Sequence, residues 1–556
     1  MSGRELSRRG FLGTAAASLA GAASMAQSQT SAKGPGTGSR AQHGEPYQLA
    51  GKRLYFYNWY YIRPGSFDWK GEDGRNVGLK DAVPPGVARL THTDQPWGIR
   101  IVAQRAERLG PLLRPERPWE QGGSMALTCV IHDAGMYRAW GGDFVPRQED
   151  APQRSHALYL ESSDGLEWKR PNLGLVEYNG SRATNLLDQG GPRGTPFVDP
   201  AAPPAERYKS IGMEDLSREI CEEYFRRRPN EWDSRADRYS DGHLTGLTGA
   251  VSPDGLRWRP FREPLVVMFS DTQVIAYYDQ ALGRYVAYTR AWVLNERSAR
   301  VPDGRSELFD VGRRSIGRTE SANFREFPVP ETILEPGPNL LPSDALYTNC
   351  KTTVPGAPDQ HLFFPTVWHT ASDSTSITVA SSHDGRLWHW VPGAPVFTTG
   401  PFGAFDGGCV FAHPNLLELP DGRFVLPYTG YNVPHKYPRG QYKYAPGYAV
   451  WPKGRLIALE ARAKGEFATM GLAPPGRKLR INALVLRGGS IQVEVADLKG
   501  TPLPGRSFAE AAPIIGDHHW TTLSWSGQDD LGHKDGMGIV LRFRMDQAQL
   551  FGLEFV

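Results

Sequence analysis

Ser162-Ser-Asp-Gly-Leu-Glu-Trp168 occurs three times in this chain with small changes. The other copies are Ser252-Pro-Asp-Gly-Leu-Arg-Trp258 and Ser382-His-Asp-Gly-Arg-Leu-Trp388, and Glu320–Phe327 and Glu460–Phe467 are two degenerate copies. The hydroxyl and the Asp-Gly pair predict a tight turn between two strands, with Gly at a positive φ. The copies lie roughly 60 to 90 residues apart, somewhat more than the repeat of a compact propeller. Five such turns predict an all-β chain with a five-bladed β-propeller.

Paired strand patterns lie between these turns. Each pair reads as strand, turn, strand, and we expect the pairs to form the two inner strands of each blade. The pairs are 125–132 with 136–140, 196–200 with 207–212, 273–278 with 284–290, 347–354 with 361–368, and 409–419 with 423–430.

The remaining segments complete the domain organisation. We assign residues 46–470 to the propeller, including an N-terminal extension (46–118) and an insertion (214–242) that caps one face. Residues 471–556 alternate apolar and polar side chains in strand fashion at 479–485, 490–495 and 539–544, which predicts a small C-terminal β-sandwich. Gly (62 residues), Pro (45 residues) and 11% aromatic residues suit many short strands joined by turns.

The first 26 residues read as an export signal. Ser7-Arg-Arg-Gly-Phe-Leu12 matches the twin-arginine pattern, an Ala/Gly-rich apolar run follows, and Ser24-Met-Ala26 offers a cleavage site. The apolar run is too short for a permanent span, and no other stretch would cross a bilayer. We therefore expect a periplasmic or secreted protein without a membrane span in its mature chain. Residues 27–45 are predicted to be a disordered linker.

Charge and cysteine content limit the partners. A net charge of +3 is too small to indicate a nucleic-acid partner. The four cysteines lack CxxC spacing, so they predict neither a zinc site nor a dense disulfide scaffold. We expect no cofactor and no metal ligand set, while a structural calcium ion and the oligomeric state stay open.

Carboxylates precede four of the five predicted inner strands. They are Glu120, Asp271, Asp344 and Asp406. Inner strands begin at the mouth of a propeller funnel, so we expect these side chains to converge on one cavity. Glycosidic cleavage needs two carboxyl groups, one as acid and one as nucleophile or base. The competing interpretation is that each carboxylate caps a turn. The Asp residues of the repeated turns are assigned a structural role.

Other candidates would bind substrate. Trp119 adjoins Glu120, Arg290 could bind a carboxylate or sulfate, and His369 and Tyr431 lie at the far ends of second strands. With Asp406, these are the predicted substrate-binding residues. Two alternatives to a hydrolase remain: a polysaccharide lyase with His369 or Tyr431 as base and Arg290 neutralising a uronate, and a glycan-binding propeller without activity.

The repeated turns, together with Pro171-Asn-Leu-Gly-Leu-Val-Glu-Tyr-Asn-Gly180, resemble exported bacterial proteins related to the five-bladed propeller glycosidases, the superfamily of invertases, levansucrases and arabinanases. The resemblance covers roughly residues 119–556. It implies a carbohydrate substrate, an invertase-like C-terminal sandwich and three acidic residues in one cavity, with Glu120, Asp271 and Asp344 at the matching positions. The chain lacks the Asn-Asp-Pro-Asn and Glu-Cys motifs of that superfamily. The sugar, the linkage, the stereochemistry and the choice between exo and endo cleavage stay open.

Overall fold

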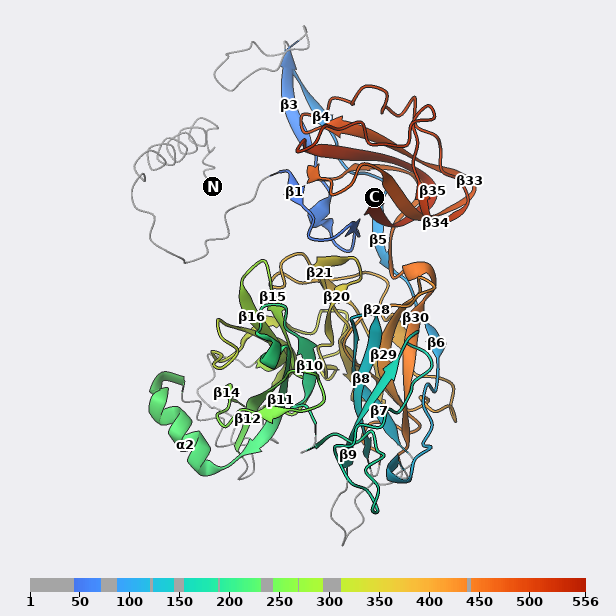
Figure 1. The fold of residues 1–556 in the computed structure, drawn as a ribbon. Helices are drawn as coiled ribbons and strands as arrows, with labels where there is room; N and C mark the ends of the chain where they lie inside the picture. Colours follow the sequence, from blue (N-terminus) through green and yellow to red (C-terminus); the bar gives the residue numbers. More distant parts are fainter. Residues whose placement is uncertain are drawn as a thin grey trace, which may run out of the picture. The chain divides into compact units, whose positions relative to one another are not determined.

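The computed structural model describes residues 45–71, 88–120, 124–144, 155–188, 191–231, 244–268, 270–293, 312–437 and 442–556. The chain is nearly all β within these ranges (Figure 1). The predicted signal peptide 1–26 and all but the last residue of the predicted linker 27–45 lie outside the described residues.

Residues 125–451 form five successive antiparallel strand groups, completed by one strand from the N-terminal extension. The first group is β7 (Met125–Asp133), β8 (Met136–Phe144) and β9 (Ser155–Ser162). The second is β10 (Thr195–Val198), β11 (Tyr208–Leu216), β12 (Leu244–Ser252), β13 (Arg259–Pro260) and β14 (Val266–Val267). The third is β15 (Ile275–Asp279), β16 (Arg284–Val293), β17 (Arg313–Ser321) and β18 (Glu331–Leu334).

The fourth group is divided along its length into two four-stranded sheets. One sheet holds β19 (Ala345–Leu346), β22 (Thr366–His369), β23 (Ser374–Ile377) and β26 (Phe397–Thr398). The other holds β20 (Lys351–Val354), β21 (Ala357–Phe363), β24 (Ala380–Ser382) and β25 (His389–Trp390). The fifth group is β27 (Cys409–Ala412), β28 (Leu417–Glu418), β29 (Phe424–Tyr431), β30 (Tyr444–Trp451) and β6 (Glu107–Leu109).

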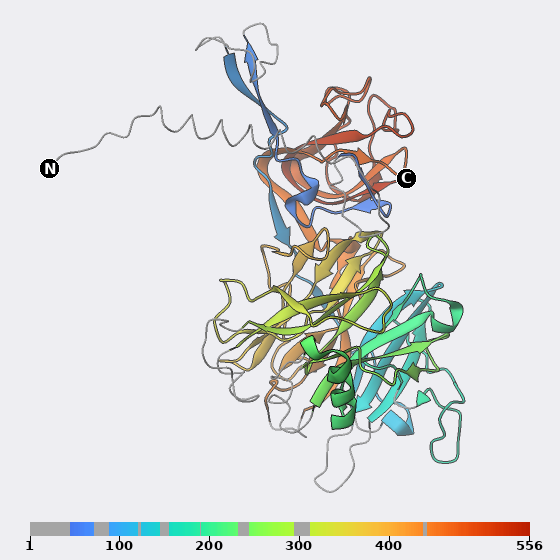
Figure 2. The ribbon, with the colours of Figure 1, turned by 90° about the vertical axis from the view of Figure 1, so that its left-hand side faces the viewer.

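The five groups contact one another in a closed ring. β7 contacts β10, β10 contacts β15, β17 contacts β19, β23 contacts β27, and β29 contacts β7 again. The last group takes its outer strand, β6, from the segment before the first group, since β6 pairs with β30 (Figures 1 and 2). A closed ring of antiparallel groups is the arrangement of a β-propeller. The predicted all-β propeller class and the predicted strand pairs are therefore confirmed.

The repeated turns follow the third strand of four groups. In the first copy the Ser162 hydroxyl accepts the backbone N–H of Gly165, and Asp164 Oδ1 accepts those of Leu166 and Glu167 at 2.8 and 2.9 Å. Hydrogen bonds from the backbone N–H groups of Glu167 and Leu166 and from Ser162 lower the pKa of Asp164. Gly165 has a φ of 77°. The degenerate copy at Ser321 repeats this geometry with Asn323 as acceptor, so the structural reading of these turns is confirmed.

Three of these turns also join neighbouring groups. The carbonyl of the motif glycine accepts a hydrogen bond from an aromatic side chain of the preceding group, and the donor–acceptor pairs are Tyr448 to Gly165 (2.9 Å), Trp140 to Gly255 (2.7 Å) and Tyr288 to Gly385 (2.8 Å). The repeated motif therefore forms a contact between neighbouring groups as well as a turn.

A second sheet of eight strands gathers both ends of the described chain. Its strands are β1 (Tyr47–Gln48), β2 (Arg53–Leu54), β5 (Arg100–Ala103), β31 (Ile457–Ala468), β32 (Leu472–Ala473), β33 (Leu479–Asp497), β34 (Asp517–Thr522) and β35 (Ile539–Phe555). The stretches 479–485 and 490–495 belong to one strand, β33, which pairs with β35 along its length. Buried aromatic residues such as Trp525 and Phe543 fill its core.

One predicted repeat is wrong. Glu460–Phe467 forms no turn, because it lies inside β31 and pairs with β35 and β5. β31 falls within the range assigned to the propeller but belongs to the C-terminal sheet. The N-terminal extension likewise supplies β1, β2 and β5 to that sheet, and it also contains the hairpin β3 (Ser66–Gly71) and β4 (Ala88–Thr93).

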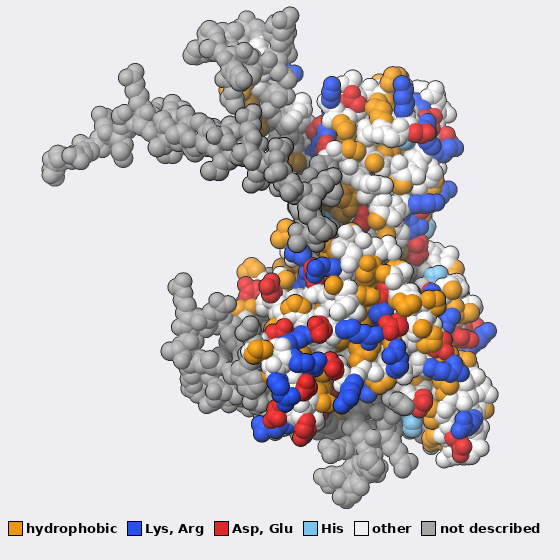
Figure 3. Space-filling view, turned by 60° about the vertical axis from the view of Figure 1, so that its left-hand side comes forward, with side chains coloured by type: hydrophobic (Ala, Val, Ile, Leu, Met, Phe, Trp, Pro, Cys, Tyr) orange, Lys and Arg blue, Asp and Glu red, His pale blue; other side chains and the backbone are white. Residues whose placement is uncertain are grey.

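Helices are few in the described residues. The insertion 214–242 contains α2 (Arg218–Arg227), which begins at the N-cap Ser217 and packs Cys221, Tyr224 and Phe225 against Val267. The short helices are η1 (Trp59–Tyr61), η2 (Pro118–Glu120), η4 (Pro204–Glu206), η5 (Pro229–Glu231) and η6 (Pro452–Gly454). None of the described helices has both the length and the apolar character that a bilayer crossing requires. Basic and acidic side chains are intermixed on the face seen in Figure 3.

Candidate active site

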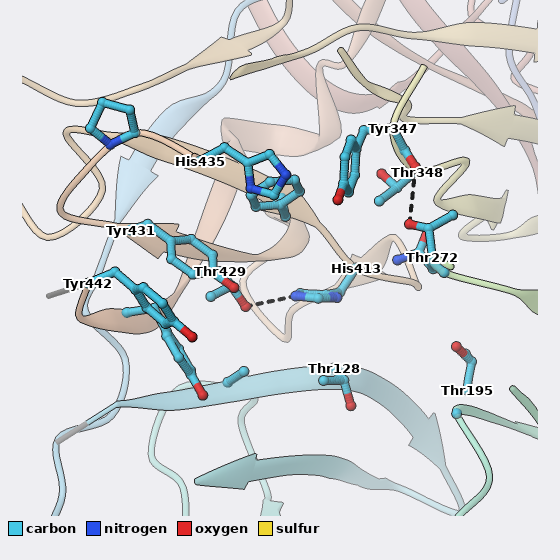
Figure 4. A pocket seen from close by; sticks show the side chains of 16 residues that line it. Thr128, Thr195, Thr272, Tyr347, Thr348, His413, Thr429, Tyr431, His435 and Tyr442 are labelled. Carbon is cyan, nitrogen blue, oxygen red and sulfur yellow. Dashed lines mark hydrogen bonds between the residues drawn. The ribbon is translucent and has the colours of Figure 1, made fainter. Parts of the chain in front are cut away.

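A cavity of about 570 Å³ lies where the five strand groups meet (Figure 4). Every group contributes to its wall, mostly through inner strands and the residues next to them. The lining residues are Ala126, Thr128, Gly194, Thr195, Thr272, Gln273, Tyr347, Thr348, Phe411, His413, Thr429, Tyr431, Pro434, His435, Tyr442 and Tyr444. This is the size range of small-molecule sites in proteins.

The wall combines aromatic rings with hydroxyl groups. Tyr431 packs against Tyr444 at a ring-centroid distance of 5.2 Å, and Tyr442 stacks on Tyr444 at 6.2 Å. On the opposite side in Figure 4, Tyr347 lies beside Thr272, whose hydroxyl donates to the Tyr347 carbonyl at 3.1 Å. Such a surface offers both flat apolar faces and hydrogen-bonding groups to a ligand.

Burial determines the protonation of two lining residues. Desolvation lowers the pKa of His413 to about 4, so its imidazole is neutral at neutral pH. Desolvation is also the largest cause that raises the pKa of Tyr431, whose phenol therefore keeps its proton. His413 Nε2 lies 2.7 Å from Thr429 Oγ1 on the neighbouring strand β29.

None of the described lining residues is an Asp or a Glu. The expected convergence of four carboxylates on this wall is therefore not seen. The four carboxylates precede residues of the wall in the chain, but their side chains contact other partners. Two of the four, Asp271 and Asp344, are close to lining residues in sequence, and the other two are held elsewhere.

Asp271 immediately precedes the lining residue Thr272. Its carboxylate forms an ion pair with Arg290 of β16, and the Asp271 side chain keeps 18% of its surface exposed. Arg290 is 2% exposed and donates to the Tyr347 carbonyl at 2.9 Å, with its guanidinium 4.7 Å from the centroid of the Tyr347 ring. Arg290 therefore contacts the lining residue Tyr347 but is not itself part of the lining.

Asp344 lies three residues before Tyr347. Its Oδ2 accepts the backbone N–H of Leu341 at 3.1 Å, and its Oδ1 lies 3.3 Å from His369 Nδ1. The other ring nitrogen of His369 lies 2.9 Å from Ser376 Oγ. Asp344 and His369 thus form a pair next to the wall, and neither lines the cavity.

Glu120 and Asp406 are fully buried in other networks. Glu120 accepts from Arg170 at 2.7 Å and from the backbone N–H groups of residues 116 and 117. Asp406 accepts from Arg108 of β6 at 2.5 Å and from the Tyr428 hydroxyl at 2.8 Å. Both geometries suit structural carboxylates, which was the competing interpretation for each residue.

Trp119 and Tyr431 differ in their placement. The Trp119 indole is buried and donates to Asn185 Oδ1 at 2.9 Å, away from the cavity. Tyr431 lines the cavity, as expected of a substrate-binding residue, although that role stays a prediction.

Sequence reasoning missed most of the described wall. Four threonines come from four different groups: Thr128, Thr195, Thr272 and Thr348. The available signal was a threonine at or near the start of four inner segments, because a side chain there reaches the centre of the ring. His413 directly follows β27 and gave no repeat signal of its own.

Comparison with known proteins gives neither a family model nor a curated protein that matches this chain. Solved structures with a similar fold include a protein titled "Glycoside hydrolase" (12% identity, TM-score 0.42, 63% of this chain and 92% of the other). A glycosyl hydrolase from Bacteroides ovatus shows 12% identity and a TM-score of 0.38, covering 64% and 94%. An exo-inulinase from Aspergillus awamori shows 10% identity and a TM-score of 0.35, covering 82% and 98%. At these values the fold assignment rests on the ring of strand groups described above.

Proposed function

We propose that the protein is an exported glycosidase that binds part of a poly- or oligosaccharide in the central cavity and hydrolyses a glycosidic bond there. The observation that carries this proposal is the wall itself, to which all five groups contribute and which combines tyrosine rings with threonine hydroxyls (Figure 4). Sugar rings present apolar faces that pack on aromatic side chains and hydroxyl groups that need hydrogen-bond partners.

Asp271 and Asp344 are our candidates for the catalytic carboxyl groups. Each lies close in the chain to a lining residue, and the hydrogen bond between Thr272 and Tyr347 brings those two segments together. The ion pair with Arg290 suits Asp271 to the role that needs an ionised carboxylate, as nucleophile or as base. Asp344 would then be the acid that protonates the leaving oxygen. A separation of about 5 Å between the carboxyl groups would favour retention, and one of about 6.5–9.5 Å inversion.

Two alternatives from the sequence fit this site to different degrees. A lyase that uses Arg290 to neutralise a uronate would need an accessible guanidinium, whereas Arg290 is 2% exposed and paired with Asp271. A glycan-binding propeller without activity would use the same wall and need no acid. Variants that lack the candidate carboxylates distinguish the two functions, because a hydrolase would lose activity and a binding propeller would have none to lose.

The test measures reducing-end release from plant, algal and microbial glycans. We expect wild-type protein to release sugar, and Asp271→Asn and Asp344→Asn to reduce the rate by at least about 100-fold, as expected for loss of an acid or a base. Glu120→Gln is the matched control, because Glu120 is a fully buried carboxylate held by Arg170, whereas Asp271 and Asp344 each lie within three residues of a lining residue. Folding of all variants is followed by circular dichroism.

Three outcomes would contradict parts of this proposal. Full activity in Asp271→Asn would remove that residue from catalysis. Products that absorb in the ultraviolet, as unsaturated sugars do, would indicate a lyase. Binding without release on every glycan would leave a recognition propeller.

The export proposal rests on Ser7–Leu12 and the apolar run that follows. The twin-arginine route carries proteins that are already folded, and all four cysteines are buried in the described fold. Replacing Arg8 and Arg9 with Lys should keep the protein in the cytoplasm. Undiminished appearance outside the cytoplasm in that variant would reject the twin-arginine route.

A further inference from the structure

We propose that His413 and Thr429 form the hydrogen-bonding pair that recognises one hydroxyl group of the bound sugar. This inference rests on the proposed function and assigns specificity within the same cavity. His413 would contact the sugar directly, and Thr429 would act through His413 as a positioning residue.

The pair is held rigidly between two strands. His413 directly follows β27, and its backbone N–H donates to the Pro427 carbonyl of β29 at 2.8 Å. Thr429 is 2% exposed, and its Oγ1 lies 2.7 Å from His413 Nε2. Because backbone and ring are both anchored, the imidazole has little rotational freedom to lose when a ligand binds.

One ring nitrogen of His413 is left for a ligand. Nε2 is engaged by Thr429, whereas Nδ1 has no hydrogen-bond partner among the described residues and is not enclosed in protein. Two other hydroxyls on the wall are committed to backbone carbonyls, Thr272 to Tyr347 and Thr128 to Trp140. His413 therefore offers a fixed polar group, and Figure 4 shows its ring projecting between the two sides of the wall.

The pair is uncharged between pH 5 and pH 8. Burial of the ring lowers the pKa of His413 to about 4, so between pH 5 and pH 8 one ring nitrogen is a donor and the other an acceptor. Thr429 can donate to Nε2 or accept from it, and that choice sets the role of Nδ1. A sugar hydroxyl can accept or donate in turn, so it matches either tautomer. Affinity should then be constant from pH 5 to pH 8.

The experiment measures binding of five probes, the methyl glycosides of glucose, galactose, mannose, arabinose and fructose. Saturation-transfer NMR selects the probes that bind the wild-type protein, and calorimetry then gives their affinities. His413→Phe should weaken binding roughly tenfold to hundredfold, since a buried sugar hydroxyl loses its partner. Thr429→Val should weaken it several-fold, and Thr429→Ser should restore it because the hydroxyl is kept.

The control is Thr319→Val, which removes a buried hydroxyl that donates to the Pro328 carbonyl in the third group, away from the cavity. Equal affinity in wild type, His413→Phe and Thr429→Val would overturn the inference while leaving the proposed function in place. A tenfold change in wild-type affinity between pH 5 and pH 8 that His413→Phe abolishes would overturn the neutral role. Binding of no probe by the wild type would overturn the sugar-binding cavity itself, and this inference with it.

Discussion

Lys351 of β20 is a charged residue in an apolar place. It is 3% exposed, and its Nζ lies 3.2 Å from the centroid of the Tyr277 ring. Desolvation lowers its pKa to about 7; the nearby Asp279 opposes that shift and Arg318 adds to it. Burial thus makes the protonated form of this side chain costly at and below neutral pH.

Lys351→Met should stabilise the protein. Below pH 7 the lysine is protonated in both states, so the folded state bears the full cost of the buried charge. Between pH 7 and about pH 10.5 the unfolded chain binds more protons at this site, so wild-type stability gains from rising pH there. We expect a gain of roughly 1–4 kcal/mol from the variant at pH 6. Denaturant unfolding at pH 6 and pH 9 checks this, and the difference between variant and wild type should shrink at pH 9.

Residues also explain why the candidate site was only partly predicted. The sequence predicts Asp271, Asp344, Asp406 and Glu120 as site residues because they precede inner strands. Of the four, only Asp271 and Asp344 lie within three residues of a lining residue. The sequence could not show that three of these carboxylates form ion pairs with arginines, because each arginine is separated from its carboxylate by many residues. The arginines are Arg290, Arg108 and Arg170. The sequence does not predict His413 as a site residue, because a single histidine after a strand forms no repeated pattern.

The repeated turn is the element that carries most of the fold information. Its Gly permits the positive φ, its Ser and Asp satisfy the backbone, and its carbonyl binds an aromatic donor from the group before it. This is why sequence predicted the strand groups well. The prediction of a turn at Glu460–Phe467 is wrong because the residues there, although similar in type to the motif, lie along the long strand β31. That strand is set by its pairing with β35, which is a tertiary contact that the local sequence does not show.

Gly255→Ala should be more destabilising than an ordinary glycine substitution. Gly255 has a φ of 77°, and an added Cβ would lie 2.8 Å from the Trp140 ring of the neighbouring group. Gly180 is the matched control, since its φ is 81° and an added Cβ would meet nothing within 4 Å. We expect Gly180→Ala to cost about 1 kcal/mol and Gly255→Ala about 2–4 kcal/mol. Equal loss in thermal unfolding of the two variants would show that Trp140 yields freely.

At the scale of the molecule, one ion pair secures the closure of the ring. Arg108 lies on β6, the strand that the N-terminal extension adds to the fifth group, and its Nε contacts Asp406 at 2.5 Å. The Asp406 side chain is fully buried, whereas Arg108 keeps 31% of its side chain exposed. The pair therefore anchors a strand that is remote in sequence.

Arg108→Met should destabilise the protein by roughly 3–5 kcal/mol, because it leaves a buried carboxylate without its counter-charge. The double variant with Asp406→Leu removes that carboxylate and should recover much of the loss. Chemical denaturation of the four proteins gives the coupling between the two sites. Additive effects would mean that the two residues do not stabilise the closure jointly.

The origin of β6 also sets an order of events during synthesis. Residues 107–109 leave the ribosome early, but their partner strand β30 is made more than three hundred residues later. The ring can close only after most of the chain has been translated, and until then the early strand must wait unpaired. Fragments that end before residue 444 lack β30 and should therefore fold less well than the whole protein. Slow translation would lengthen the interval in which the incomplete ring can aggregate.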